Sequence, residues 1–261
     1  MKGEPNVTTL SEVTAAVREP QLSGQTVVVI GGSSGMGFET ALRARAEGAD
    51  VIIVGRNPDR LQRAATELGA RDSAALDATD PAALGRFFDG LPATIDHVMA
   101  TAGGPYYAPL ADLDQARAVR DFGEHQWLAI TVAKHAVGRV RPGGTLLFVG
   151  GTGARRPARG QALAGAGTAA LPALVANLAL EVAPVRVNLI AAGFVDTPLS
   201  ASLLGDDLEK RRQQLRATLP IARVVGPADI AALAVHIMTN TALTGATYDI
   251  DGGQQLLGGG A

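Results

Sequence analysis

The chain contains no cysteine, and only 4% of its 261 residues are aromatic. Without cysteine there can be no disulfide bond, no thiolate nucleophile and no cysteine-ligated metal. Its four histidines lie apart from any cluster of acidic residues at ligand spacing, so we expect no metal site. The N-terminus has no long apolar run behind basic residues, so we expect neither a signal peptide nor a membrane-spanning segment, and a cytoplasmic location.

Charge and composition narrow the class of protein and the partners that we expect for it. The formal net charge is -2, 18% of the residues are charged and 47% are apolar. A chain so close to neutrality gives no general reason to expect nucleic acid or an anionic membrane as a partner. Its length suffices for one large domain with a well-buried core. The composition therefore favours a soluble globular protein packed mainly with Ala, Val and Leu.

The chain does contain a regular alternation of short apolar runs and helical windows. The runs lack a polar face, which is typical of parallel strands covered on both sides. They span residues 26–30, 51–54, 97–100, 145–149, 185–190 and 246–250. The helical windows span residues 36–47, 58–68, 81–91, 115–140, 162–183 and 227–239. This alternation predicts an α/β fold, a single doubly wound parallel sheet with helices on both faces.

The remaining segments set the expected boundaries of the domain. We expect an N-terminal extension over residues 1–22, with a short helix over 9–19, before a single domain over 23–257. The glycine-rich residues 258–261 are expected to form a flexible tail. The polar segment 198–219 interrupts the alternation and carries a run of charges. A solvated helix explains that run, and a movable lid over a pocket is the alternative, since ligands bind at the carboxyl ends of the strands.

The first apolar run leads directly into a glycine-rich turn that opens a helix. Gly31 can take the positive φ of the turn, while Gly35 and Gly37 let the backbone approach a pyrophosphate. Free amides at the helix N-terminus then offer an anion site. A flexible turn is the alternative, but the strand–turn–helix context favours dinucleotide binding. The candidate binding residues here are Gly31, Ser33, Ser34, Gly35, Met36 and Gly37.

The ends of the next two strands bear on the choice of dinucleotide. A free ribose 2′-hydroxyl usually meets an acidic residue after the second strand, but Gly55 stands here and Arg56 follows it. A guanidinium suits a 2′-phosphate through paired hydrogen bonds, which favours NADP(H) over NAD(H). A solvated loop arginine is the alternative. Asp77, followed by Ala78, ends the third strand, where its carboxylate can accept a hydrogen bond from an adenine amine.

Together these features resemble the short-chain dehydrogenase/reductase family, and the resemblance runs from residue 22 to residue 253. The family's Gly-x-x-x-Gly-x-Gly turn matches the glycine turn above, and its Asn-Asn-Ala-Gly motif is half retained as Ala102-Gly103. The resemblance implies a Rossmann-like fold, an NADP(H) cofactor and a small-molecule substrate. It also implies a homo-oligomer, a dimer or a tetramer.

The same resemblance extends to the nicotinamide end of the cofactor. Residues 186–198 are similar to the family's Arg-Val-Asn…Pro-Gly…Thr stretch, whose backbone and threonine bind the nicotinamide carboxamide. The resemblance makes Gly193, Val195 and Thr197 the corresponding candidates.

The chain departs from the family where the chemistry takes place. Family enzymes orient the carbonyl with a serine and move the proton with a Tyr-x-x-x-Lys pair, and no such pair occurs in this chain. Alignment places Gly151 at the serine position, Ala164 at the tyrosine position and Thr168 at the lysine position. A shift of one residue would present Thr152 as the hydroxyl instead, but no shift produces a tyrosine or a lysine. The family's helical asparagine falls near His125. The family mechanism therefore does not transfer, although hydride transfer needs only a nicotinamide and an electrophile.

Two side chains could replace the missing proton donor. His125 is expected on the long helix that borders the pocket, and imidazole titrates near neutrality. Tyr107 follows a Gly-Gly-Pro turn above the fourth strand, where ligands bind. Packing roles are the alternatives for both. Three arginines, Arg155, Arg156 and Arg159, could bind an anionic substrate, with a solvated loop as the alternative.

Three functions are compatible with this combination of features. The first is an atypical NADP(H)-dependent reductase that acts on a carbonyl, an imine or an activated alkene. The second is an NADPH-binding sensor or partner protein without turnover. The third is a non-redox enzyme, such as an isomerase or a lyase, that keeps the cofactor as scaffold. We favour the first, because the candidates at the nicotinamide end accompany those at the adenine end.

Overall fold

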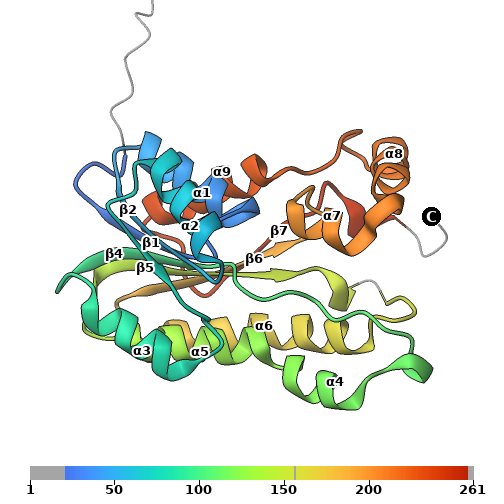
Figure 1. Cartoon of the computed structure of the whole chain (residues 1–261), viewed down its shortest axis with the longest axis horizontal. Coiled ribbons are helices and arrows are strands. Elements are labelled where there is room, and N and C mark those ends of the chain that lie inside the picture. The colour runs from blue at the N-terminus through green and yellow to red at the C-terminus, as the bar shows by residue number, and fades with distance from the viewer. Residues whose placement is uncertain (1–20, 156, 258–261) are drawn as a thin grey trace, which may run out of the picture.

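Seven parallel strands form one sheet in the order β3-β2-β1-β4-β5-β6-β7 in a computed structural model that describes residues 21–155 and 157–257 (Figure 1). The strands are β1 (Thr26–Ile30), β2 (Asp50–Gly55), β3 (Asp72–Ala75), β4 (Ile95–Ala100), β5 (Val140–Gly151), β6 (Arg186–Ala192) and β7 (Thr247–Ile250). The strand order changes direction between β1 and β4, as in doubly wound folds. The α/β fold predicted from the alternation of apolar runs is confirmed.

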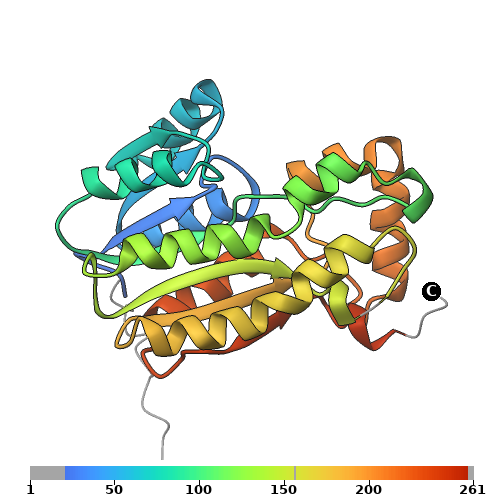
Figure 2. The same cartoon turned by 90° about the horizontal axis from the view of Figure 1, so that it is seen from below.

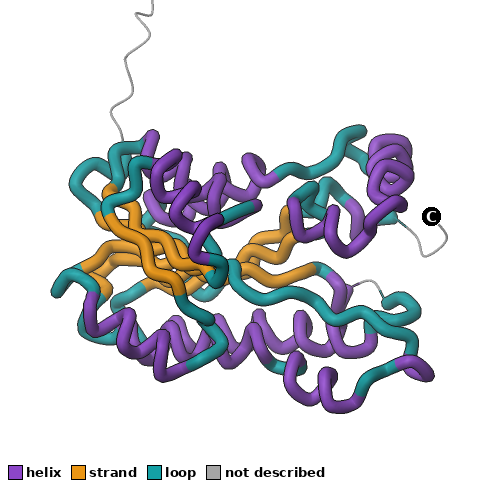
Figure 3. The backbone as a smooth tube through the Cα atoms, in the orientation of Figure 1, coloured by secondary structure: helices purple, strands orange, loops and turns teal. Residues whose placement is uncertain are grey.

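Helices cover both faces of the sheet, as Figure 3 shows. On one face the buried side chains of the sheet pack against α3 (Pro81–Gly90), α5 (Glu124–Ala136) and α6 (Ala162–Glu181). On the other face they pack against α1 (Gly35–Ala46), α2 (Pro58–Leu68) and α9 (Pro227–Thr239). The strands are buried on both sides, which explains why their sequences lack a polar face.

Local signals explain why several helices begin where the sequence predicts. Asn57 caps α2, since its side chain accepts a hydrogen bond of 2.8 Å from the Arg60 amide, and Pro58 occupies the first turn. Asp80 caps α3 in the same way, accepting from the amides of Ala82 and Ala83. These pairs of a capping residue and a proline fix the helix starts independently of tertiary contacts.

One predicted helix, over residues 115–140, is divided in the structure. A shorter helix, α4 (Gln115–Asp121), ends before Gly123, which has a φ of 88° and precedes α5. A left-handed glycine interrupts the i to i-4 hydrogen bonds of a helix. The break gives α4 a direction of its own at the end of the molecule where α7 (Pro198–Leu204) and α8 (Leu208–Thr218) also lie (Figures 1 and 2).

Several expectations concern residues outside the described ones. These are the extension before residue 21, its helix over residues 9–19, the tail 258–261 and Arg156. Within the described residues, Leu22 is already buried in the core, and its amide donates to the Glu47 carbonyl over 2.9 Å.

By length and composition alone, one described helix, α6, could cross a membrane. Leu171, Val175 and Leu178 on one side of this helix are buried in the core beside the sheet. The core helix of a soluble protein passes the same test, so the finding is weak evidence for a membrane segment.

A buried histidine lies at the amino end of the sheet, away from the glycine turn. His97 on β4 is 1% exposed, and its Nε2 pairs with the Gln25 side chain over 2.8 Å. Burial lowers the pKa of His97 to about 3, and the positive charges of Arg141 and Arg186 also lower it, while Asp96 opposes the shift. The folded protein therefore binds fewer protons at His97 than the unfolded chain at every pH between about 3 and 6.5.

We predict that acid destabilises the protein through His97. Its contribution is complete above the unfolded pKa and is lost as the pH falls, by about 2 kcal/mol between pH 7 and pH 5. Denaturant unfolding at the two pH values measures the loss, and His97→Gln should show a smaller one. His236→Gln, which changes an exposed histidine on α9, should lose as much stability as the wild type. Equal losses in His97→Gln and the wild type would contradict the prediction.

Candidate active site

The glycine turn after β1 forms a cradle that admits no side chain. Gly31 has a φ of 94°, and a Cβ on it would collide with the hydroxyl of Thr101. A Cβ on Gly37 would collide with the carbonyl oxygen of Gly31. Ser34 begins α1 without a side-chain capping bond among the described residues, so the first amides of α1 remain available to an anion. The cradle therefore fits the pyrophosphate of a dinucleotide.

The ends of β2 and β3 adjoin this turn. A Cβ on Gly55 would lie 2.9 Å from the Ser33 hydroxyl, so β2 ends against the glycine turn. Arg56 follows it and is exposed. The amide and hydroxyl of Thr79 donate to Asp77 over 3.0 and 2.8 Å, and the amide bond is the main cause of the lowered pKa of Asp77. The charge of Arg56 lowers the pKa of Asp77 further, which places these two candidates near each other.

His125 lies against the loop that follows β4. Gly103 has a φ of 101°, and a Cβ on it would lie 3.1 Å from Nε2 of His125. Burial lowers the pKa of His125. The Glu124 carboxylate lies 3.5 Å from the same point, and burial, followed by the charge of Asp121, raises its pKa. An imidazole and a carboxylate therefore flank Gly103 at the start of α5.

A cavity of about 950 Å³ opens beside this loop. Its volume falls within the range of small-molecule sites. Ten of the residues singled out from the sequence line it, namely Met36, Gly103, Tyr107, His125, Gly151, Ala164, Thr168, Gly193, Val195 and Thr197. The other cofactor candidates do not line it and lie at the ends of β1 to β4 and the start of α1; they are Gly31, Ser33, Ser34, Gly35, Gly37, Arg56, Asp77, Ala78 and Ala102.

The residues aligned with the family's acid–base positions form one small wall of the cavity. A Cβ on Gly151 would lie 3.3 Å from the Thr168 methyl, so β5 and α6 meet closely there. The Thr168 hydroxyl donates back to its own helix, to the carbonyls of Ala164 and Gly165 at 2.9 and 3.1 Å. This wall therefore presents no titratable group to the cavity.

Tyr107, the other candidate donor, lies in the loop after β4 and lines the cavity. The residue is 51% exposed, and partial burial of the phenol raises the pKa of Tyr107. A phenol with a raised pKa holds its proton more tightly, which makes it a weaker acid than His125 at neutral pH.

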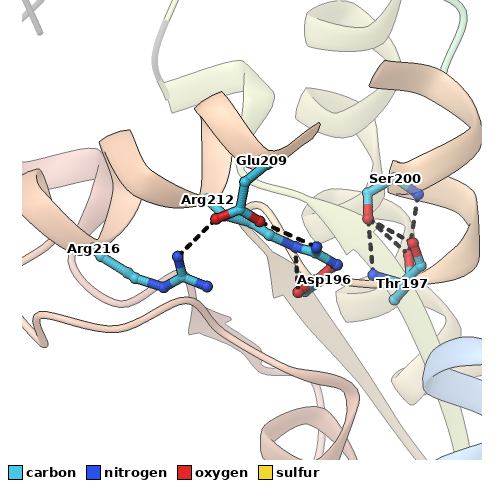
Figure 4. Close-up of polar contacts among 6 residues, drawn as sticks. All are labelled: Asp196, Thr197, Ser200, Glu209, Arg212 and Arg216. Atoms are coloured by element: carbon cyan, nitrogen blue, oxygen red, sulfur yellow. Dashed lines mark hydrogen bonds and ion pairs between the residues drawn. The ribbon is translucent and has the colours of Figure 1, made fainter. Parts of the chain in front are cut away.

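The segment expected as a lid, 198–219, folds into α7, a short 3-10 helix and α8. Figure 4 shows how it is held: Arg212 on α8 donates two hydrogen bonds to Asp196, at 2.9 and 2.8 Å. Thr197 follows Asp196, and its hydroxyl accepts from the Ser200 amide over 3.2 Å at the start of α7. The bidentate ion pair therefore ties α8 directly to the strand end that carries Thr197.

Several polar side chains of the cavity were not expected from the sequence, and three of them come from distant segments. Arg117 comes from α4, Arg211 from α8 and Gln254 from the segment after β7. The Gln254 side chain accepts a hydrogen bond of 3.2 Å from the Phe194 amide, beside the candidate nicotinamide segment. No local sequence pattern indicates a role for these residues, because each reaches the cavity through the packing of a distant segment. Among the described residues, no cluster of His, Asp and Glu could hold a metal ion.

The parallel sheet, the glycine cradle and the adjoining cavity define a dinucleotide-binding α/β protein. A family model described as enoyl-(acyl carrier protein) reductase matches residues 30–255. The chain therefore belongs to the short-chain dehydrogenase/reductase family, a family of NAD(P)-dependent oxidoreductases.

Individual relatives agree with this assignment. The structure of the MalC reductase/Diels–Alderase from Malbranchea aurantiaca superposes with a TM-score of 0.84, at 27% identity, covering 92% of this chain and 99% of that one. A small-chain dehydrogenase in complex with NADPH gives a TM-score of 0.77 at 27% identity, covering 89% and 99%. The NADP-dependent (R)-specific alcohol dehydrogenase of Lentilactobacillus kefiri is 27% identical over 89% of this chain and 97% of its own length.

Proposed function

We propose that this protein is an NADPH-dependent reductase of a small molecule that works without the family's Ser-Tyr-Lys residues. Its acceptor is a carbonyl, an imine or an activated alkene. The observation that carries the proposal is the convergence on one cavity of Gly193, Val195 and Thr197 with a wall made by Gly151, Ala164 and Thr168. This neighbourhood of the nicotinamide-side candidates and positions without a family acid supports the proposal.

Different residues of the chain bind different parts of the cofactor and of the acceptor. The cradle of Gly31 and Gly37 receives the pyrophosphate, and Arg56 receives the 2′-phosphate through paired hydrogen bonds. The backbone from Gly193 to Val195 and the start of α7 face the nicotinamide. Bound NADPH supplies the hydride. The protein orients the acceptor beside it and excludes water with the lid that Arg212 holds.

His125 is the proposed source of the proton. It lines the cavity, lies against Gly103 and has a pKa lowered by burial, so it releases a proton readily once charged. A protonated imine needs no such donor, because hydride addition to it yields a neutral amine. Tyr107 remains the second candidate.

The comparisons support the cofactor and leave other chemistry open. Two of the relatives are described with NADP or NADPH, which agrees with the use of Arg56 for a 2′-phosphate. The MalC description joins a reductase to a Diels–Alderase, so a chain of similar fold is credited with a reaction besides reduction. The alternative functions are a non-redox enzyme and a sensor without turnover, and the experiment must distinguish both from the reductase.

The cofactor preference gives a specific prediction. We expect Arg56→Ala to weaken NADPH binding about 30-fold, because a charge-assisted bond to phosphate is worth roughly 1.5–3 kcal/mol, and to leave NADH binding unchanged. Fluorescence titration measures both. Arg63→Ala serves as the control: it removes an exposed arginine that lies on α2, and the variant should bind NADPH normally. Unchanged NADPH affinity in Arg56→Ala would remove the argument for NADP(H).

Turnover distinguishes the three functions. NADPH oxidation is followed by absorbance with a panel of aldehydes, ketones, cyclic imines and enones, and the products are analysed separately. Hydride transfer to a panel member supports the reductase. Products formed without a change in nicotinamide absorbance indicate a non-redox enzyme, and tight NADPH binding without any product indicates a sensor.

The assembly and location of the protein remain proposals. Helix α6 is apolar, yet only Leu171, Val175 and Leu178 of it are buried within one chain. A second copy packed against this helix would remove the exposed apolar surface from water. We propose a homo-oligomer that acts in the cytoplasm, and light scattering at increasing protein concentration tests the oligomer.

A further inference from the structure

We propose that Arg117 binds a carboxylate of the substrate, so that the acceptor is an apolar molecule with one anionic end. This inference rests on the proposed reductase function, since it assigns the substrate class of the same cavity. It starts from α4, the helix that the break at Gly123 sets apart from α5.

The guanidinium of Arg117 is held from two sides. The Tyr106 ring lies beneath it, with the Arg117 Cζ atom 4.1 Å from the ring centroid. Nε of Arg117 donates to Asp121 over 3.0 Å, one helical turn further along α4. The Tyr106 hydroxyl accepts from the Asp114 amide over 3.1 Å, and the Asp114 side chain caps α4 by accepting from the Arg117 amide. The ring and the helix are therefore joined around the guanidinium.

This arrangement leaves the terminal nitrogens of Arg117 available. Among the described residues, no hydrogen bond or ion pair engages Nη1 or Nη2, while Nε is used by Asp121. The residue lines the cavity. The two terminal nitrogens of an arginine present parallel donors to a carboxylate, and stacking on an aromatic ring limits the rotamer entropy lost on binding.

The charges around the cavity favour an anion. Its described lining residues carry two guanidinium groups, those of Arg117 and Arg211, and one carboxylate, that of Asp121. Arg120 also pairs with Asp121, at 3.5 Å, so two guanidinium groups share this carboxylate. Arg211 comes from the lid helix α8, which lies at the same end of the molecule as α4 (Figures 1 and 2). The described lining of the cavity therefore carries more positive than negative side chains.

Apolar side chains make up part of the remaining wall. The lid contributes Leu199, Leu203 and Leu204, and Phe122 and Leu163 come from the opposite side. These side chains would exclude water from the middle of the substrate while its carboxylate stays at the partly exposed Arg117. This part of the cavity suits an apolar keto acid, or its imine or enone counterpart, and the two guanidinium groups disfavour a dication.

The test uses two probes of one shape, 4-phenylbutanoate and its neutral amide. Calorimetry measures their binding to the full chain, with and without NADP⁺. We expect the acid to bind about tenfold more tightly than the amide, the low end for a charged hydrogen bond, because the Arg117 side chain is 51% exposed. Arg117→Gln should weaken the acid about tenfold and leave the amide unchanged.

Arg120→Gln is the matched control, since it removes a neighbouring arginine of α4 that does not line the cavity. Thermal unfolding of both variants shows that the fold is kept, and Arg117→Lys should retain part of the preference for the acid. Equal binding of acid and amide to the wild type, absence of acid binding at millimolar concentration, or an equal loss in Arg117→Gln and Arg120→Gln would overturn the inference. Acid binding that depends on Arg117 without any NADPH turnover would leave this site standing and reject the reductase.

Discussion

Gly37→Ala is expected to weaken NADPH binding by at least about 100-fold, the loss expected when one or two backbone hydrogen bonds to a charged phosphate are broken. The added methyl would collide with the Gly31 carbonyl oxygen and would lie 2.9 Å from the Thr101 hydroxyl. To avoid these collisions the glycine turn must move away from α1, and the turn then no longer directs its amides at the pyrophosphate. Fluorescence titration with NADPH measures the loss, and circular dichroism checks that the sheet remains.

The same substitution elsewhere provides the control. Gly90 is at the end of α3, and a Cβ on it would meet nothing within 4 Å. Gly90→Ala should bind NADPH normally and gain up to about 1 kcal/mol of stability, because alanine favours the helix over glycine. If Gly37→Ala also binds NADPH normally, the turn is not the cofactor cradle, and the proposed function loses its foundation.

His125→Ala is expected to lower kcat for a carbonyl acceptor by about 100-fold, at the low end of what positioned proton transfer contributes. NADPH affinity should stay within a few-fold of the wild type, because the cradle is formed by other residues. His236→Ala removes an exposed histidine on α9 and should leave kcat unchanged. The measurement is steady-state reduction with saturating NADPH.

The pH dependence separates a proton donor from a packing residue. Burial lowers the pKa of His125, so the charged donor becomes scarcer as the pH rises from below that pKa. We expect kcat/KM of the wild type to fall over this range, with an apparent pKa under the ordinary histidine value of about 6.5. His125→Gln should lose this limb of the profile. A limb that persists in His125→Gln would assign the proton to another group, with Tyr107 or substrate as the next candidates.

The strand and helix pattern could be predicted because each element carries its own signal. Helix α2 begins at Pro58 behind Asn57 and ends at Gly69, whose φ of 58° is left-handed. These local signals give boundaries without tertiary information. The division after α4 was missed because Gly123 lies in an otherwise continuous helical pattern, and a glycine there is compatible with either outcome.

Some residues of the candidate site could be predicted from the sequence, and others could not. The glycine turn follows from one continuous stretch, and the alignment with the family also gave Gly193, Val195 and Thr197, which do line the cavity. Arg117 was not singled out, because its role depends on Tyr106 lying beneath it, eleven positions earlier, across a loop. Gln254 was missed for the same reason, since its hydrogen bond spans 60 positions of the chain.

The amino acids alone determined the order of strands and helices along the chain, the turn that only glycine can form and the lack of a Tyr-x-x-x-Lys pair. Periodicity, capping and backbone freedom act within a few residues, so these properties can be read along the chain. Which side chains share the cavity was decided by the folded structure. His125 meets Gly103, Arg212 meets Asp196 and Arg117 meets Tyr106 because packing brings separate elements to one end of the sheet. Such contacts depend on distance in space, which a linear pattern does not contain.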